Sequence, residues 1–152
     1  MKSRTRARSV ALQALFEIDI AGHPLDQVLQ NRLDESSLEP KLSEFTTQIV
    51  SEVQQLVEIL DSFIAEHAPE WPLNQVATID RNIIRIALWE FTVYKETPIK
   101  VVINEAVELA KLYGSDSTPR FVNGVLGSLS SRQNEIQQQM QQVLEKEEIT
   151  LS

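Results

Sequence analysis

Apolar residues recur every three or four positions along most of the chain, which is the spacing of an amphipathic helix rather than a strand. The clearest run lies between about Lys41 and Glu66 and contains seven such positions: Leu42, Phe45, Ile49, Val53, Leu56, Leu60 and Phe63. This pattern predicts one long helix that packs along its whole length. Pro69 and Pro72 would end that helix and mark a boundary between two helical halves.

Helices are also predicted on both sides of this segment. An amino-terminal helix covers about residues 3–19, and it is apolar around so much of its circumference that it should lie between neighbours. A short helix follows and ends near residue 32. In the second half, apolar faces predict helices at about residues 79–94 and 98–113. Pro119 stands where the first turn of a last helix would begin, and the apolar positions of that helix continue to Ile136 and Met140.

Together these segments predict an all-α fold with one domain over residues 1–152, a compact bundle of about six or seven helices. The amino-terminal half covers about residues 1–68, and the carboxyl-terminal half covers about residues 73–132. Residues 133–152 form an acidic tail that is rich in glutamine. This tail is expected to project or fray.

Composition limits the classes of protein to which this chain can belong. Hydrophobic residues make up 42% and charged residues 24% of the chain, which suits a globular protein. No apolar run approaches the roughly 20 residues of a membrane span. The basic start of the chain is not followed by an unbroken apolar segment, so a secretory signal is not expected. Because cysteine is absent, disulfides and thiolate metal sites are excluded. A cytoplasmic protein without a membrane span is predicted.

The distribution of charge matters more than the net charge of −8, which by itself argues against a nucleic-acid partner. Four cations precede the first carboxylate of the chain, Glu17: Lys2, Arg4, Arg6 and Arg8. Arg4 and Arg8 fall on the apolar side of the first helix, so their guanidinium groups should lie beyond the packed core on a protruding basic arm. Arginine binds phosphate and stacks on bases. An RNA-binding arm and a disordered, solubilising terminus are both consistent with this charge pattern.

Patterns for catalysis and metal binding are missing. Neither His23 nor His67 belongs to a motif with metal-ligand spacing, and no glycine-rich phosphate loop occurs. Glu105 and Glu108 are three residues apart on a helix, but the histidine that completes carboxylate metal sites is absent. We interpret that pair as a solvated helix face. No enzymatic activity, metal site or cofactor is predicted.

The central helix carries three further polar features. Arg81 and Arg85 share its polar strip, and Trp89 lies at the edge of that strip. A surface cation–π pair between Arg85 and Trp89 is favoured over a second nucleic-acid or partner contact. Glu90 projects into the apolar face, and a buried carboxylate needs a hydrogen-bond donor. The backbone amides that start the helix after Pro98 are the expected donors.

Four segments of the chain form a combination that is specific to one family: R-x-R-x-x-ALQALFEID, IDRNIIRIALWEF, P-x-KVVINEAVELAK and RFVNGVLGSL. In this order, over most of residues 4–130, they resemble the bacterial NusB family of transcription antitermination factors. The resemblance implies a two-part helical bundle that pairs with NusE, a small-subunit ribosomal protein, and binds the boxA sequence of nascent RNA. Such complexes help RNA polymerase to resist premature termination, notably in ribosomal RNA operons.

The resemblance also implies site residues. By position, the RNA-binding residues are Arg4, Arg6, Arg8, Phe16, Arg81 and Arg120. Phe16 stands where a tyrosine is common and keeps a stacking ring without the hydroxyl. Asp80 and Phe121 match positions that bind the protein partner. Gly127 stands where an aspartate is frequent, so a contact made by that carboxylate is not expected here.

Two other classes of function fit parts of the sequence. The first is a purely protein–protein helical adaptor, whose basic arm serves solubility or an acidic partner. The second is an RNA-modifying enzyme, because the same helical module precedes the catalytic domain of some RNA cytosine methyltransferases. That domain is Rossmann-like, and 152 helical residues leave no space for it. The sequence leaves the oligomeric state open between a monomer and a homodimer.

Overall fold

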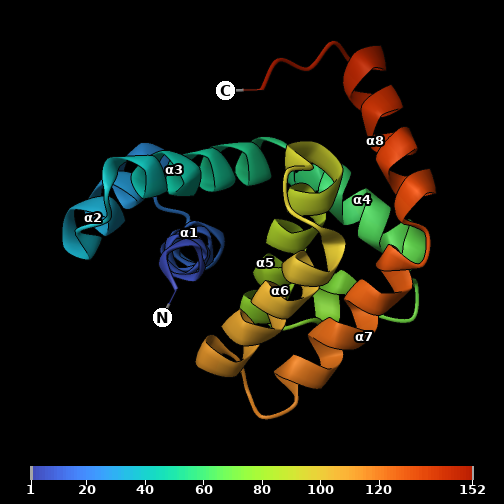
Figure 1. Cartoon of the computed structure of the whole chain (residues 1–152), viewed down its shortest axis with the longest axis horizontal. Helices are drawn as coiled ribbons and strands as arrows, with labels where there is room; N and C mark the ends of the chain where they lie inside the picture. Colours follow the sequence, from blue (N-terminus) through green and yellow to red (C-terminus); the bar gives the residue numbers. More distant parts are fainter. Residues whose placement is uncertain (1, 152) are drawn as a thin grey trace.

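The structure, a computed structural model, describes residues 2–151, and this part of the chain contains helices and no strand (Figure 1). The helices are α1 (Ser3–Ala21), α2 (Leu25–Ser36), α3 (Pro40–Gln55), α4 (Val57–His67), η1 (Leu73–Gln75), α5 (Thr78–Trp89), η2 (Glu90–Tyr94), α6 (Ile99–Tyr113), α7 (Thr118–Ser130) and α8 (Gln133–Lys146). The prediction of an all-α fold is confirmed. The predicted number of six or seven is wrong, because residues 2–151 form eight α-helices.

One of the additional helices arises from a break at Leu56. Its backbone angles are φ −101° and ψ 11°, which are not helical, and the predicted single helix is divided into α3 and α4. The chain changes direction there, as Figure 1 shows. The apolar spacing continues through the break because Leu56 itself is buried, together with Val53 before it and Leu60 after it. Periodicity alone therefore could not locate the break.

The other additional helix is α8, which occupies most of the predicted tail. It packs instead of fraying, because Ile136 and Met140 are completely buried. The side-chain amide of Gln137 donates a 2.6 Å hydrogen bond to the backbone carbonyl of Phe91. That carbonyl belongs to η2, a π-helical turn, where the regular helical hydrogen-bonding pattern is interrupted. The expectation that the tail frays is wrong for α8, where the buried Ile136 and Met140 continue the apolar face that the spacing predicts for the last helix.

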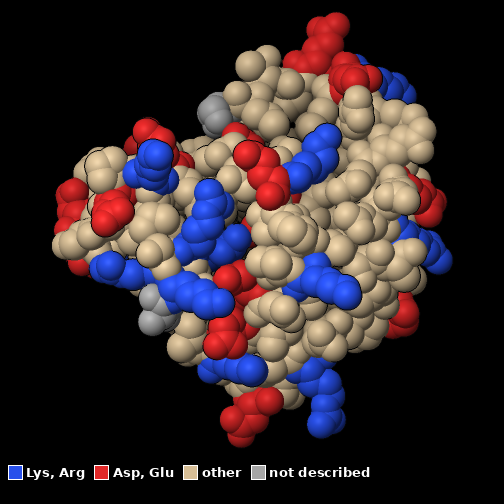
Figure 2. All heavy atoms as spheres, viewed as in Figure 1, with Lys and Arg blue, Asp and Glu red and all other residues tan. Residues whose placement is uncertain are grey.

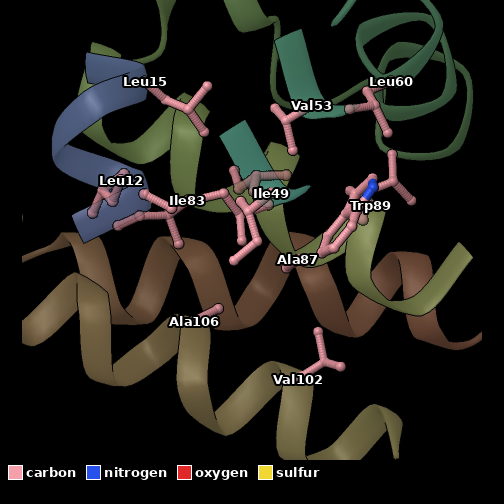
Figure 3. Close-up of a cluster of buried hydrophobic side chains, with 14 of the residues drawn as sticks. Leu12, Leu15, Ile49, Val53, Leu60, Ile83, Ala87, Trp89, Val102 and Ala106 are labelled. Carbon is pink, nitrogen blue, oxygen red and sulfur yellow. The ribbon is translucent and has the colours of Figure 1, made fainter. Parts of the chain in front are cut away.

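A single hydrophobic core extends through both predicted halves. Figure 3 shows Leu12 and Leu15 of α1 in one cluster with Ile49 of α3 and Ile83 of α5. Trp89, at the end of α5, is completely buried, and its indole nitrogen donates to the carboxylate of Glu52 at 3.0 Å. A buried indole N–H requires such an acceptor. Because α1 packs against α3 and also against α5, the position of its first turn is determined by elements from both parts of the chain.

None of the helices in residues 2–151 is long and apolar enough to cross a membrane.

Candidate nucleic-acid interface

Arg8 lies inside the protein, where only 2% of its surface is exposed. Its Nε donates to one oxygen of Glu90 at 2.9 Å, and its Nη2 donates to the other oxygen at 2.5 Å. Glu90 is 1% exposed, so the two side chains form a bidentate ion pair away from water. The prediction that Arg8 projects past the core is wrong, because a carboxylate meets it there. The same pair shows that the donor to Glu90 is Arg8 and not the amides after Pro98.

Glu105 adds a second carboxylate to this contact. One of its oxygens lies 3.7 Å from Nη1 of Arg8, and both accept hydrogen bonds from the hydroxyl of Thr5, at 3.0 and 2.7 Å. Thr5 is buried and Glu105 is half-buried, so the interpretation of Glu105 as part of a solvated face is wrong; Glu108 is exposed. These contacts attach the first turns of α1 to α6 and η2.

Arg4 is exposed but rests on aromatic side chains. Its guanidinium carbon lies 4.2 Å from the centre of the Phe45 ring, a cation–π contact. Its two Nη atoms donate to the hydroxyl of Tyr94 at 3.2 and 3.3 Å. The Tyr94 ring in turn stacks on Trp89, with 5.3 Å between the ring centres. The basic segment is therefore an anchored helical turn and not a free arm.

Arg6 is a second exposed arginine in the first turns of α1. Its Nη2 donates to the backbone carbonyl of Ser36 at the end of α2. Figure 2 shows lysine and arginine side chains gathered where the amino-terminal end of α1 emerges, with carboxylates close to them. A local cluster of this kind can attract phosphate even on a protein of net negative charge, since salt screens charges beyond about 8 Å. Arg4 and Arg6 are the predicted RNA-binding residues that this surface exposes.

Arg81 and Arg85 belong to a second network of charges, centred on Asp19 at the end of α1. Asp19 lies 3.0 Å from Arg81 and 3.1 Å from Arg85. Arg85 also binds Asp61 through two hydrogen bonds of 2.8 and 2.7 Å. The predicted surface pair of Arg85 with Trp89 is wrong, because Arg85 binds these carboxylates and Trp89 is buried against Glu52.

The pKa of the Asp19 carboxyl lies below its usual value. Burial acts to raise this pKa, but hydrogen bonds from Arg81 and Asn82, and the charges of Arg81 and Arg85, outweigh burial. A lowered pKa in the folded state means that the ionised carboxylate stabilises the fold above the ordinary aspartate pKa of 3.8. The stabilisation is lost as the pH falls through the folded-state pKa.

We expect the change Asp19→Asn to reduce the free energy of unfolding at pH 7 by about 1 kcal/mol, a value kept small because the side chain is partly solvated. The deficit should shrink as the pH falls below 3.8, where the carboxyl of the unfolded chain becomes protonated, and it should vanish below the lower pKa of the folded state. The free energy of urea unfolding, measured for the wild type and the variant at pH 7 and at pH 3, gives the deficit at each pH. Asp116→Asn, in an exposed loop, is the matched control. A deficit of equal size at both pH values would contradict this account.

The predicted residues Asp80, Arg120 and Phe121 meet at a cavity of about 610 Å³ between η1, α5 and α7. The cavity is lined by Trp71, Gln75, Val76, Ala77, Asp80, Ser117, Arg120, Phe121 and Gly124. Its volume is in the range of ligand-sized clefts, about 300–1,000 Å³. The rings of Trp71 and Phe121 meet edge to face, with 6.2 Å between their centres. We call this set of residues the aromatic pocket.

Asp80 lies half-buried at the wall of the aromatic pocket. Burial raises the pKa of its carboxyl, while a 3.0 Å hydrogen bond from the hydroxyl of Thr118 acts to lower it. The bond joins the first turn of α5 to that of α7 and positions the carboxylate. Arg120 is exposed at the rim of the pocket. The pocket thus combines an apolar surface with one carboxylate and one guanidinium.

The structure separates the predicted site residues into several places. Asp80, Arg120 and Phe121 share the aromatic pocket, whereas Arg81 lines a different cleft with Asp61 and Arg85. Phe16 is half-buried on α1. Trp71 was not predicted, although a tryptophan between two prolines at the boundary of the halves is a signal that could have drawn attention to it. Gly127 has open space beside it.

No group of three histidine, aspartate or glutamate side chains within residues 2–151 is arranged to hold a metal ion.

Comparison with known proteins identifies the family. The model of the NusB family matches residues 5–131. The transcription antitermination protein NusB of Roseiflexus castenholzii is 50% identical over 134 residues, which cover 87% of this chain and 94% of that protein. The solved structure of NusB from T. maritima superposes with a TM-score of 0.76 at 31% identity, covering 90% of this chain and 92% of that one.

A further solved structure is that of antitermination factors NusB and NusE in complex with dsRNA. The matching chain has a TM-score of 0.76 at 25% identity, and the match covers 84% of this chain and 96% of that chain. The match of the family model spans most of the present chain, and the identity to the Roseiflexus protein is high over nearly its whole length. The chain belongs to the NusB family.

Proposed function

We propose that the chain is an RNA-binding transcription antitermination factor that has no enzymatic activity and acts in the bacterial cytoplasm. It pairs with NusE, binds boxA RNA and joins the antitermination complex of RNA polymerase, promoting processive transcription of ribosomal RNA operons. The observation that carries this proposal is the match to a chain from the structure of antitermination factors NusB and NusE in complex with dsRNA, at a TM-score of 0.76 over 84% of the present chain.

The aromatic pocket supports the protein-binding part of this function. Partly exposed aromatic side chains in a cleft with a few fixed polar groups are typical anchors of protein interfaces. Phe121 offers the edge of a ring that Trp71 supports, and Asp80 offers a carboxylate beside it. We assign Asp80 and Phe121 to the contact with NusE. We assign Arg120, an exposed residue that lines the same pocket, to RNA that runs past the bound partner.

The first turns of α1 support the RNA-binding part. Arg4 and Arg6 are exposed there and carry the charge that phosphate requires. Arg8 is too deeply buried for a direct contact, so its role is to hold these turns in place through Glu90. Phe16 supplies a half-exposed ring for stacking on a base. Arg81 donates to Asp19 and to the backbone carbonyl of Leu73, and 20% of its side chain is exposed, so we assign it a contact with RNA through this exposed part.

The double change Arg4→Gln and Arg6→Gln should weaken boxA binding and make it less sensitive to salt. Each phosphate contact to single-stranded RNA contributes about 0.7 to the slope of log affinity against log salt, so the slope should flatten by about 1.4. Titration of the NusE complex with labelled boxA RNA at several salt concentrations measures this.

The matched control for that titration is Arg132→Gln, which removes an exposed arginine at the junction of α7 and α8. It should leave the slope unchanged. If the double variant kept the wild-type slope, the assignment of the first turns of α1 to RNA would be wrong. The chain would then resemble a purely protein–protein adaptor.

A further inference from the structure

A further cleft, of about 410 Å³, lies between α1, α2 and the carboxyl-terminal end of α6. Unlike the aromatic pocket, this cleft is lined mostly by residues with polar side chains. The residues that matter here are Arg6, Ser9, Gln13, Arg32, Glu35 and Tyr113. The family resemblance drew attention to Arg6 alone among them. We call this set of residues the polar cleft.

Hydrogen bonds fix the floor of the polar cleft. The side-chain amide of Gln13 donates to the hydroxyl of Tyr113 at 2.8 Å, and that hydroxyl also bonds to Ser9. The amide oxygen of Gln13 accepts from Arg32 at 3.1 Å, and Arg32 is held in turn by Glu17 at 3.0 Å. Each of these side chains therefore has a defined position before any ligand arrives, which reduces the entropy lost on binding.

The rim of the polar cleft offers both donors and an acceptor. Arg6 donates to the carbonyl of Ser36 through one Nη atom, and its other guanidinium N–H groups make no hydrogen bond in the part of the chain that the structure describes. Glu35 is exposed on α2, and its carboxylate makes no hydrogen bond or ion pair within residues 2–151. A carboxylate at this position disfavours a phosphate as occupant. The cleft instead suits a flat, neutral group that both accepts and donates hydrogen bonds.

We propose that the polar cleft binds one unstacked guanine base of single-stranded RNA, an inference that rests on the RNA-binding function proposed above. Guanine presents the adjacent acceptors O6 and N7 to a guanidinium. Its N1–H and N2–H groups are adjacent donors, which a single carboxylate can accept together. Glu35 reads these two donors, and the N–H groups of Arg6 that Ser36 does not bind read the acceptor edge. The charge of Arg6 also attracts the phosphates of the same strand outside the cleft, and the ring of Tyr113 forms part of the wall. Adenine and the pyrimidines lack two adjacent donors of this kind.

The test uses the full chain in complex with NusE and four uridine decamers that differ at one central position, which is guanosine, inosine, adenosine or uridine. Fluorescence anisotropy should show roughly tenfold tighter binding of the guanosine decamer than of the adenosine decamer, as expected for a bidentate base contact. The inosine decamer lacks the N2 amino group and should lose most of this preference.

Glu35→Gln removes the carboxylate from an exposed position and should abolish the preference for guanosine. Glu44→Gln, on α3, removes the same charge outside the polar cleft and should retain it. Equal binding of the four decamers by the wild type, or a guanosine preference that survives in Glu35→Gln, would overturn the inference. In either case the proposed function stands if boxA RNA still binds better than a scrambled sequence. Failure to bind any RNA would overturn both.

Discussion

Replacing Arg8 by alanine should lower the free energy of unfolding by about 3–5 kcal/mol, because Glu90 would remain buried without its ionic partner. The side chains of Arg8 and Glu90 are both almost entirely inaccessible to water, so solvent cannot replace the lost hydrogen bonds. Glu105 and Thr5 would lose part of their network as well. Urea unfolding followed by circular dichroism measures the loss.

Two variants make this prediction specific. Arg6→Ala removes an exposed arginine two positions earlier in the same helix and should change stability by only about 0.5 kcal/mol. The double change Arg8→Met and Glu90→Leu removes both buried charges and should recover much of the loss, because a well-packed apolar pair often replaces a buried ion pair without cost. A loss of less than about 1 kcal/mol for Arg8→Ala would show that the pair does not hold α1 in place.

Replacing Phe121 by alanine should weaken the binding of NusE by about 2–4 kcal/mol, the range of an aromatic hot spot at the centre of an interface. The change removes the ring that meets Trp71, so the aromatic pocket keeps only one of its two aromatic side chains. Isothermal titration calorimetry with purified NusE measures the affinity. Because Phe121 is only half-buried, the variant should remain folded, which its thermal unfolding would verify.

The control for this experiment is Val101→Ala, which shortens an apolar side chain that is 42% exposed on α6 and does not line the aromatic pocket. NusE should bind this variant as it binds the wild type. Wild-type affinity in Phe121→Ala would mean that the partner binds elsewhere on the surface. The pocket would then have to be assigned to another ligand.

Helical periodicity was enough to predict the fold class, but it did not predict where charged groups are buried. The phasing of α1 correctly predicts that Arg8 lies on its apolar side, but a charge on that side does not have to leave the core when a buried carboxylate meets it. Glu90 was likewise recognised as a buried carboxylate in need of a donor. The two are 82 residues apart in the chain, so only the packing of α1 against α5, which η2 continues, shows that they are partners.

The break at Leu56 illustrates a different limit. A non-helical residue that is itself apolar and buried does not disturb the spacing of apolar positions, so α3 and α4 looked like one helix. The aromatic pocket shows the same limit for the site. Asp80 and Phe121 came from the family resemblance, but Trp71 belongs to a loop between the halves, whose contacts depend on the tertiary fold.

The most direct test of the central proposal is a titration of the chain, with and without NusE, against labelled boxA RNA and a scrambled RNA of the same composition. We expect weak binding of boxA by the chain alone and markedly tighter binding by its complex with NusE, together with a clear preference for boxA over the scrambled RNA. Equal affinity for the two RNAs in the presence of NusE, or failure of the chain to bind NusE, would contradict the proposed function.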